Sequence, residues 1–176
     1  MAGMVLGEPN HFAILLDEVP SWNFVGDRTF CNGILLFAMD GSIFPTELIT
    51  VPLSGEIQLM ETRFEHLVDN PQLFSLKKED AFHQIYGITF PDSITVDNDY
   101  SYDMTPNSLE DKGYFIFAVK NGEKVRILAA KMKYILEESR HDISTADIKE
   151  TFLSIREVKE LVAGLKLYGD CQKEEM

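Results

Sequence analysis

The chain has 176 residues, a size at which one domain can fold around a hydrophobic core without disulfides or metal ions. Its hydrophobic content of 45% and charged content of 26% are typical of globular proteins and argue against extended disorder. The net charge of −13 disfavours binding to nucleic acid or anionic lipid and favours cationic partners, although a protein that is merely soluble and acidic would show the same composition.

The two cysteines and the N-terminal region indicate where the protein works. Cys31 and Cys171 are too far apart to form a disulfide framework or a metal site, and they fit a reducing compartment. The N-terminal region lacks the basic and apolar segments of a signal peptide, and no apolar run approaches the roughly 20 residues that cross a bilayer. We therefore expect a cytoplasmic protein with no membrane partner.

The N-terminal part of the chain predicts strands. Residues 12–19 and 33–39 are apolar runs bounded by turn residues, as in buried strands. Asp40-Gly41 then predicts a two-residue turn, in which Phe37 faces Phe44 across the hairpin.

After Ser54, a predicted N-cap, the apolar period changes from two to 3.6 residues, which predicts an amphipathic helix. Its apolar stripe consists of Ile57, Met60, Phe64, Leu67 and Val68. Glu56 and Arg63 are assigned to the opposite, polar face. A shorter helix is predicted over residues 77–86, with Gly87 as its C′ residue.

An acidic segment follows, with no Lys or Arg among its carboxylates. These acids are Asp92, Asp97, Asp99, Asp103, Glu110 and Asp111. Over residues 98–104, tyrosines alternate with Ser and Asp, which predicts a strand with one aromatic face and one acidic face.

Residues 113–131 contain two runs of aromatic and β-branched residues around Asn121-Gly122, a strong hairpin signal. A type I′ turn at this dipeptide would place Lys120 opposite Glu123. One face of this central hairpin is apolar and predicts core. The other face mixes apolar side chains with long cationic ones, which predicts a partly covered surface.

The last part of the chain is less clear until its final helix. Residues 132–138 fit a strand or a helix equally well, and residues 148–153 alternate weakly, as in a last strand. Ser154 and Glu157 have the spacing of a capping box at the start of the final helix. Gly169 is the predicted end of that helix.

Hairpins with inserted helices predict an α+β fold with a mostly antiparallel, twisted sheet packed by two or three helices. We expect one domain over residues 1–170 and a frayed tail over residues 171–176.

The motifs of catalysis and metal binding are missing from this sequence. Asp97, Asp99 and Asp103 match three positions of a calcium loop, but Tyr102 occupies the position of its Gly and Ser108 that of its bidentate Glu. The histidines lack zinc-site spacing, and no nucleophile or phosphate-binding motif is present. We expect no catalytic residue, no metal and no cofactor.

Several segments, in the same order along the chain, carry a family resemblance. They are Gly7-Glu8-Pro9, HFAILLDEVPSWN from His11, NGILLFAMDGSIFP from Asn32, DNDYSYDMTPNSL from Asp97 and FAVKNGEKVRILAAKMKYILEESRH from Phe117. The chain resembles immunity proteins of bacterial polymorphic-toxin and contact-dependent inhibition systems, in immunity protein family forty-two. The resemblance implies an antidote that binds and blocks one cognate toxin domain. Such toxins are often nucleases, whose active surfaces are basic because they hold phosphates.

The family offers no residues to transfer, so the toxin-binding surface is predicted from this sequence alone. The carboxylates of the acidic segment could meet a basic partner, and its tyrosines add apolar contact area. The predicted residues are Asp97, Asp99, Tyr100, Tyr102, Asp103, Glu110 and Asp111, with Trp22 and Glu18 as outlying candidates. Three other interpretations stay open: a solvated acidic face, a small-ligand protein or enzyme with a pocket between sheet and helices, or a housekeeping adaptor that binds some other basic protein.

Overall fold

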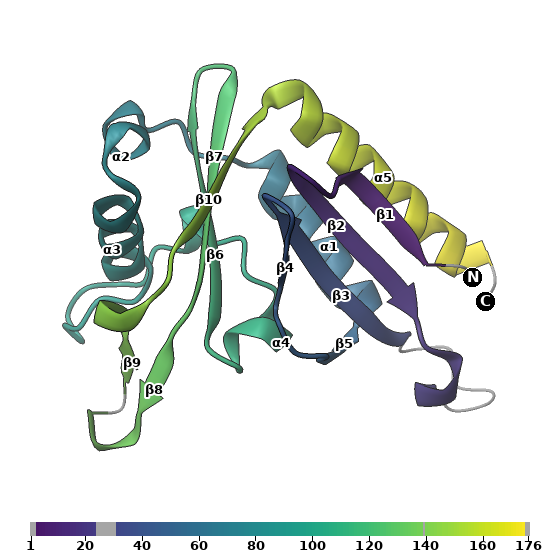
Figure 1. Cartoon of the computed structure of the whole chain (residues 1–176), viewed down its shortest axis with the longest axis horizontal. Coiled ribbons are helices and arrows are strands. Elements are labelled where there is room, and N and C mark those ends of the chain that lie inside the picture. The colour runs from purple at the N-terminus through teal and green to yellow at the C-terminus, as the bar shows by residue number, and fades with distance from the viewer. Residues whose placement is uncertain (1–2, 24–30, 139, 175–176) are drawn as a thin grey trace.

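In the computed structural model, which describes residues 3–23, 31–138 and 140–174, the strands form three antiparallel sheets (Figure 1). The first sheet has the order β1 (Met4–Glu8), β2 (Phe12–Glu18), β3 (Asn32–Met39) and β4 (Ser42–Phe44), and β5 (Thr50–Pro52) also pairs with β3. The second has the order β10 (Lys149–Ser154), β7 (Lys124–Lys131) and β6 (Tyr114–Asn121). The third consists of β8 (Lys133–Ile135) and β9 (Arg140–Asp142).

Helices complete the predicted α+β fold. They are α1 (Leu53–Glu65), α2 (Pro71–Ser75), α3 (Lys78–Thr89), α4 (Asn107–Glu110) and α5 (Ile155–Glu174). The α+β class and the antiparallel pairing are confirmed, but the two predicted hairpins belong to different sheets rather than to one. In Figure 1, α2 and α3 lie on one side of the second sheet, and the first sheet with α1 and α5 lies on the other.

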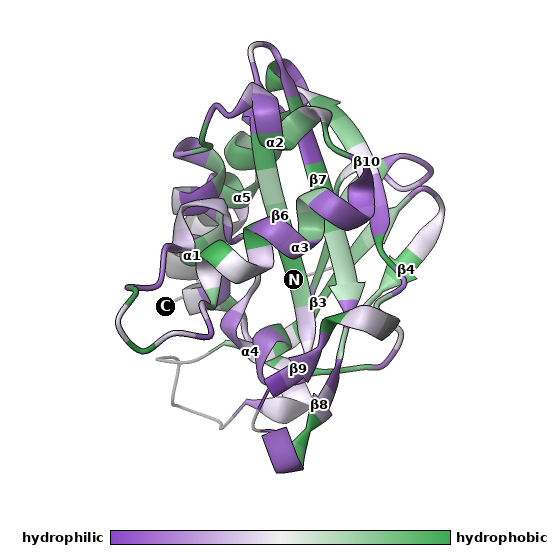
Figure 2. Ribbon diagram, turned by 90° about the vertical axis from the view of Figure 1, so that its left-hand side faces the viewer, coloured by the Kyte–Doolittle hydropathy of each residue, from purple (hydrophilic) through white to green (hydrophobic). Residues whose placement is uncertain are grey.

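The second sheet separates two hydrophobic cores. Side chains of one face, such as Ile116, pack with the first sheet, α1 and α5, whereas those of the other face, such as Phe117, pack with residues of α2 and α3. Figure 2 shows α3 lying across β6 and β7, whose ribbons are hydrophobic over most of their length. The prediction that only one face is core was therefore wrong, because both faces are buried.

Arg126 explains why the hairpin face that carries cationic side chains was predicted to be only partly covered. Its side chain is only 4% exposed and does not reach solvent. The guanidinium donates to the carbonyl oxygens of Phe74 at 2.8 Å and Leu76 at 2.7 Å, and pairs with Glu150 at 2.8 Å. A buried cation is tolerated when its charge is paired and its donors are satisfied, as they are here.

The registers of the two hairpins differ in how well the sequence predicted them. Phe37 pairs with Phe44 as predicted, and the Asp40-Gly41 turn has φ of +50° and +74°. In the second hairpin, Lys120 pairs with Val125 instead of Glu123, so the two loop residues are Gly122 and Glu123. This register differs by two residues from the predicted one, which leaves every side chain on its predicted face.

Helix ends were predicted less well than helix faces. The N-cap of α1 is Pro52 rather than Ser54, α3 continues past Gly87 to Thr89, and α5 continues past Gly169. The capping box of α5 is confirmed. The Glu157 carboxylate accepts from the Ser154 N–H at 2.7 Å, and the Ser154 hydroxyl oxygen accepts from the Glu157 N–H at 3.2 Å.

Candidate protein-binding site

The acidic segment does not form the strand that was predicted over residues 98–104. Residues 91–99 are a loop after α3, and a helical turn, Tyr100–Tyr102, follows it. The Asp99 carboxylate accepts from the Ser101 N–H at 2.9 Å, which turns the chain at this point. Hydrogen bonding with the Ser101 side chain, and then with its N–H, lowers the pKa of Asp99. Asp97 and Asp99 are exposed, and Tyr100 is 50% exposed.

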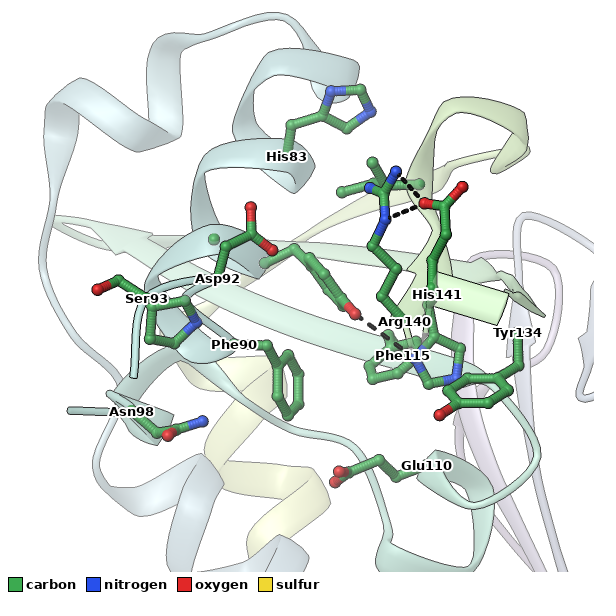
Figure 3. A pocket seen from close by; sticks show the side chains of 15 residues that line it. His83, Phe90, Asp92, Ser93, Asn98, Glu110, Phe115, Tyr134, Arg140 and His141 are labelled. Carbon is green, nitrogen blue, oxygen red and sulfur yellow. Dashed lines mark hydrogen bonds and ion pairs between the residues drawn. The ribbon is translucent and has the colours of Figure 1, made fainter. Parts of the chain in front are cut away.

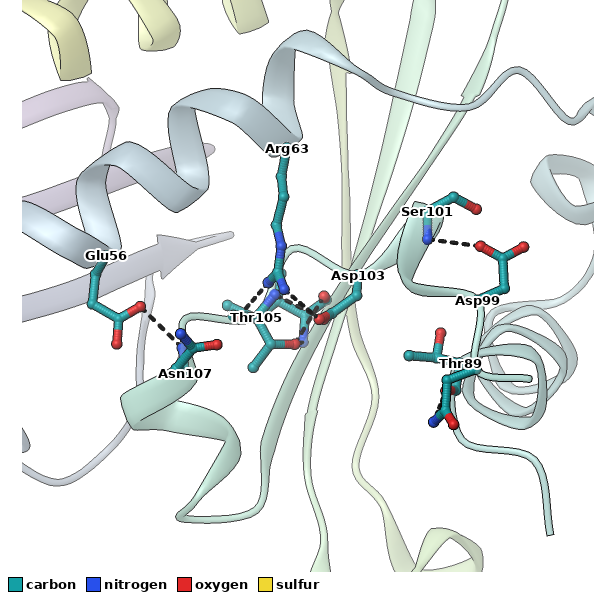
Figure 4. A network of polar contacts seen from close by, with 10 residues as sticks. Glu56, Arg63, Thr89, Asp99, Ser101, Asp103, Thr105 and Asn107 are labelled. Atoms are coloured by element: carbon teal, nitrogen blue, oxygen red, sulfur yellow. Dashed lines mark hydrogen bonds and ion pairs between the residues drawn. The ribbon is translucent and has the colours of Figure 1, made fainter. Parts of the chain in front are cut away.

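Tyr102 and Asp103 face inward, which corrects the prediction that they form part of the exposed surface. Tyr102 is 7% exposed, and its hydroxyl accepts from the Asn70 side-chain amide at 3.0 Å. Asp103 is 1% exposed and lies 3.0 Å from the Arg63 guanidinium (Figure 4). Neither side chain is available to a partner in this conformation.

Two side chains of α1 hold the segment after Asp103 in place (Figure 4). Arg63 pairs with Asp103 and donates to the Thr105 carbonyl oxygen. Glu56 accepts from the backbone N–H groups of Asn107 at 3.0 Å and Ser108 at 2.8 Å, at the start of α4. Glu56 is 3% exposed, so its assignment to a solvated helix face was wrong.

The Asp103 carboxylate lacks complete compensation for its burial. Oδ1 accepts from the Thr105 N–H at 2.9 Å, whereas Oδ2 lies 3.0 Å from Arg63 without a hydrogen bond of good geometry. Burial therefore raises the pKa of Asp103, and the Arg63 guanidinium opposes that rise.

A cleft of about 780 Å³ lies beside the acidic segment, between α3, the 91–99 loop, α4 and the β8–β9 hairpin (Figure 3). Its aromatic lining consists of Tyr86, Phe90, Phe115, Tyr134 and His141. The rings contact one another: Phe90 and Phe115 lie 5.5 Å apart between centroids, Phe115 and His141 4.9 Å, and Tyr134 and His141 5.1 Å. Most of the ring pairs are edge-to-face, an arrangement that aromatic quadrupoles favour.

Carboxylates surround these rings. Asp92, Glu110 and Glu138 line the cleft together with Arg140, which pairs with Glu138 at 2.6 Å. A smaller hollow of about 560 Å³ adjoins the cleft at Glu110 and includes Asp111. The acidic segment therefore continues into the edge of the cleft.

The titratable groups of the cleft show the effect of burial and negative charge. Burial, and then the charges of Asp92 and Glu110, raise the pKa of Tyr86 to about 12. Burial, and then the neighbouring Asp103, raise the pKa of Glu110. Burial lowers the pKa of His141, which favours the neutral imidazole.

Exposed apolar side chains stand on both sides of the cleft. The 91–99 loop and the helical turn after it present Ile94, Val96 and Tyr100, and the β8–β9 hairpin and the turn between its strands present Tyr134 and Leu136. Apolar and aromatic groups gathered at one place, with polar groups around them, are typical of protein-binding surfaces.

The structure brings most of the predicted surface together. Asp97, Asp99, Tyr100, Glu110 and Asp111 all lie at or beside the cleft, and the Tyr100 ring is 6.0 Å from that of Phe90. The outlying candidate Glu18 is the last residue of β2, and Trp22 ends the helical turn Pro20–Trp22 that follows. In Figure 1 this end of the first sheet lies far from β8 and β9. Trp22 is 38% exposed, and Glu18 accepts from the Asn23 side chain at 3.5 Å.

Sequence reasoning missed the cleft itself. Residues 132–138 fitted a strand or a helix equally well, so Tyr134 had no predicted place. One signal was present: Tyr134 and Leu136 are apolar residues in a segment otherwise rich in charge. Their partners, Phe90 and Phe115, are distant in sequence, so no local pattern could join them.

The arrangement in the cleft gives little support to acid–base chemistry. His83 and His141 line it, but the polar contact of His141 is with the Tyr86 hydroxyl, at 3.5 Å, rather than with a carboxylate. Within residues 3–23, 31–138 and 140–174, no three His, Cys, Asp or Glu side chains converge as metal ligands would. Among the helices of the same residues, none has the length and hydrophobicity to cross a membrane.

The α+β fold defines a small single-domain protein, and comparison with known families assigns it to the immunity proteins. The family described as Immunity protein 42 matches residues 4–168, and the chain belongs to that family. The crystal structure of CdiI from Burkholderia dolosa AUO158 is similar over 94% of this chain and 99% of that chain, with a TM-score of 0.76 and 25% identity. None of the curated proteins compared with the chain is similar enough to count as a match.

Proposed function

We propose that the protein neutralises a cognate toxin domain by binding it through the cleft and its rim. This cleft surface consists of Asp97, Asp99, Tyr100, Glu110 and Asp111 together with Ile94, Val96, Tyr134 and Leu136. The observation that carries the proposal is that exposed apolar side chains and carboxylates lie together on the segments that flank the cleft. Apolar groups of this kind supply affinity when buried by a partner, and charges around them supply specificity and speed.

The proposed partner is a basic toxin domain, and a nuclease fits best because its active surface must hold phosphates. The net charge of −13 would attract such a domain and speed its capture. In this proposal the protein acts in the cytoplasm by occupying the toxin surface, without catalysis or a cofactor.

The first experiment is co-purification with the C-terminal domain of the toxin encoded beside this protein. A triple variant, D97K/D99K/D111K, then tests the surface. These side chains are exposed, so the variant is expected to fold, and the association rate is expected to fall at least about 10-fold because local attraction becomes repulsion.

The matched control is E8K/E123K/E160K, which changes the net charge equally at exposed residues that do not line the cleft. Its association rate is expected to fall much less. Equal rates for the two variants would show that only net charge matters and that the acidic segment is a solvated face. Trp22→Ala provides a further control and is expected to leave affinity unchanged, since Trp22 lies outside the cleft surface.

A small-ligand protein or an enzyme is the alternative, favoured by the volume of the cleft and by His83 and His141 in its lining. The exposed apolar residues on both walls argue for a larger partner, because a small ligand would leave them bare. Protection of cells from the toxin separates the two functions. An antidote loses protection in the triple variant, whereas a small-ligand protein gives none in any form.

A further inference from the structure

We propose that the cleft receives one cationic side chain of the bound toxin, an arginine in preference to a lysine, between its aromatic walls and its free carboxylates. This inference rests on the proposed function and adds the chemistry of the group that the cleft selects. It makes the cleft the centre of the interface and the acidic segment its rim.

The aromatic walls offer the first part of such a site. Phe90 and Tyr134 are only partly buried, and Tyr134 is 48% exposed in the absence of a partner. A guanidinium or ammonium group is attracted to the face of an aromatic ring, and the attraction grows when water is excluded. The planar guanidinium also stacks on rings and is more weakly hydrated than an ammonium, which is the reason for preferring arginine.

The carboxylates offer the second part. Arg140 is the cation that lines the cleft, and its salt bridge with Glu138 leaves Asp92 and Glu110 without an ion pair among the described residues. In the view of Figure 3, these two carboxylates lie on either side of the rings of Phe90 and Phe115. A cation in the cleft would contact the aromatic rings and lie near these carboxylates, while Arg140 stays paired with Glu138.

The remaining titratable groups agree with this assignment. His141 is held towards its neutral form by burial and so does not compete as a cation, and His83 lines the outer part of the cleft from α3. Burial first, and then repulsion from neighbouring carboxylates, raise the pKa values of Glu110 and Tyr86, and the opposing effects of Arg63 and Arg140 do not cancel these rises. An anionic ligand would add to that repulsion, whereas a cation would relieve it.

The test uses the toxin domain and the isosteric variant Glu110→Gln, which removes one charge and keeps the shape of the cleft. The dissociation rate is expected to rise about 10-fold or more, because a desolvated charge pair is lost. Tyr134→Leu, which keeps apolar area but removes the ring, is expected to raise it as well. Glu123→Gln is the control, since Glu123 is exposed in the β6–β7 turn, and its dissociation rate is expected to change less than about 2-fold.

A double-mutant cycle identifies the cation. Each arginine and lysine of the toxin surface is replaced by methionine and combined with Glu110→Gln. The expected result is strong coupling between Glu110→Gln and the substitution at one toxin position, with no coupling at the other positions. If the toxin binds but Glu110→Gln has no effect, or couples equally weakly to every position, the inference is overturned while the proposed function stands.

If the toxin domain does not bind the wild-type protein, the proposed function fails and the cleft is tested by itself. The probe is N-acetyl-arginine methylamide, with the uncharged citrulline analogue as control, followed by two-dimensional NMR. Shifts at Phe115, Tyr134 and His141 with the arginine compound only, reduced in Glu110→Gln, would support the cation site. Equal shifts with both compounds, or none, would overturn it.

Discussion

Asp103 and Arg63 are the residues whose roles changed most between sequence and structure. In the sequence Asp103 belongs to an acidic run without cations, whereas in space it is buried against a guanidinium from α1. The pair fixes the position of the segment that leads from the acidic loop to α4. The pair therefore supports the cleft surface indirectly, because it fixes the backbone of this segment and does not contact a partner.

Replacing Arg63 with methionine is expected to lower the free energy of unfolding by about 3 kcal/mol at pH 7, because a buried carboxylate loses its partner. The pKa of Asp103 is already raised in the folded protein, and loss of Arg63 raises it further. The folded variant then binds a proton that the unfolded chain releases, so its stability deficit shrinks as the pH falls through the raised pKa of Asp103 towards the pKa of an unfolded Asp, about 3.9. Urea unfolding at pH 7 and about pH 4 measures this difference.

Arg156→Met is the matched control, because Arg156 is exposed and pairs with Glu160 only at the surface of α5. It removes the same charge and is expected to leave stability unchanged at both pH values. A deficit in the Arg63 variant that is the same at both pH values would show that the cost comes from lost packing and not from the Asp103 charge.

At the scale of elements, the turn of the β6–β7 hairpin distinguishes the observed register from the predicted one. Both registers place each side chain on the same face of the sheet. The structure places Gly122 at the first loop position, with φ of +57°, and pairs Asn121 with Lys124 in the ladder. A type I′ turn centred on Asn121 and Gly122 would instead require positive φ at both residues.

Gly122→Ala is therefore expected to lower the free energy of unfolding by about 1 kcal/mol, because an L side chain is strained at positive φ. The added methyl group meets no atom within 4 Å, so a clash does not contribute. Asn121→Thr is expected to be tolerated, since threonine suits a strand. Thermal unfolding of the two variants measures their stabilities. A larger loss of stability for Asn121→Thr than for Gly122→Ala would favour the type I′ register.

At the scale of the whole molecule, the second sheet is shared by two cores, and its strand β6 also forms part of the cleft. Phe115 takes part in both the packing and the site, because it belongs to the core beneath α3 and also lines the cleft. The floor of the cleft is therefore buried sheet, whereas its walls are α3, α4, the 91–99 loop and the β8–β9 hairpin.

The net charge of −13 gives a prediction about the rate of association with the toxin domain. The association rate with a basic toxin domain is expected to fall about 10-fold or more between roughly 0.05 M and 0.5 M salt, because screening shortens the range of attraction. The dissociation rate is expected to change much less. Stopped-flow or biosensor measurements across this range provide the test, and a flat association rate would show that the toxin surface is not basic.

The sequence alone determined features whose information is local. The strands around Asp40-Gly41, their register and the capping box at Ser154 and Glu157 were predictable because turn chemistry and side-chain alternation act between near neighbours. The faces of the second hairpin were predictable for the same reason, even with its register displaced by two residues. Family resemblance is also carried by the sequence, and the match over residues 4–168 confirms it.

Only the tertiary structure decided which polar residues are buried and which aromatic residues meet. Glu56, Arg126 and Asp103 look like surface residues in the sequence, and each is buried because a partner distant along the chain satisfies its charge or hydrogen bonds. The cleft depends on Phe90, Phe115 and His141 coming together from separate elements. Such pairings depend on long-range packing, which leaves no periodic trace in any one segment, and this is why the site emerged only from the fold.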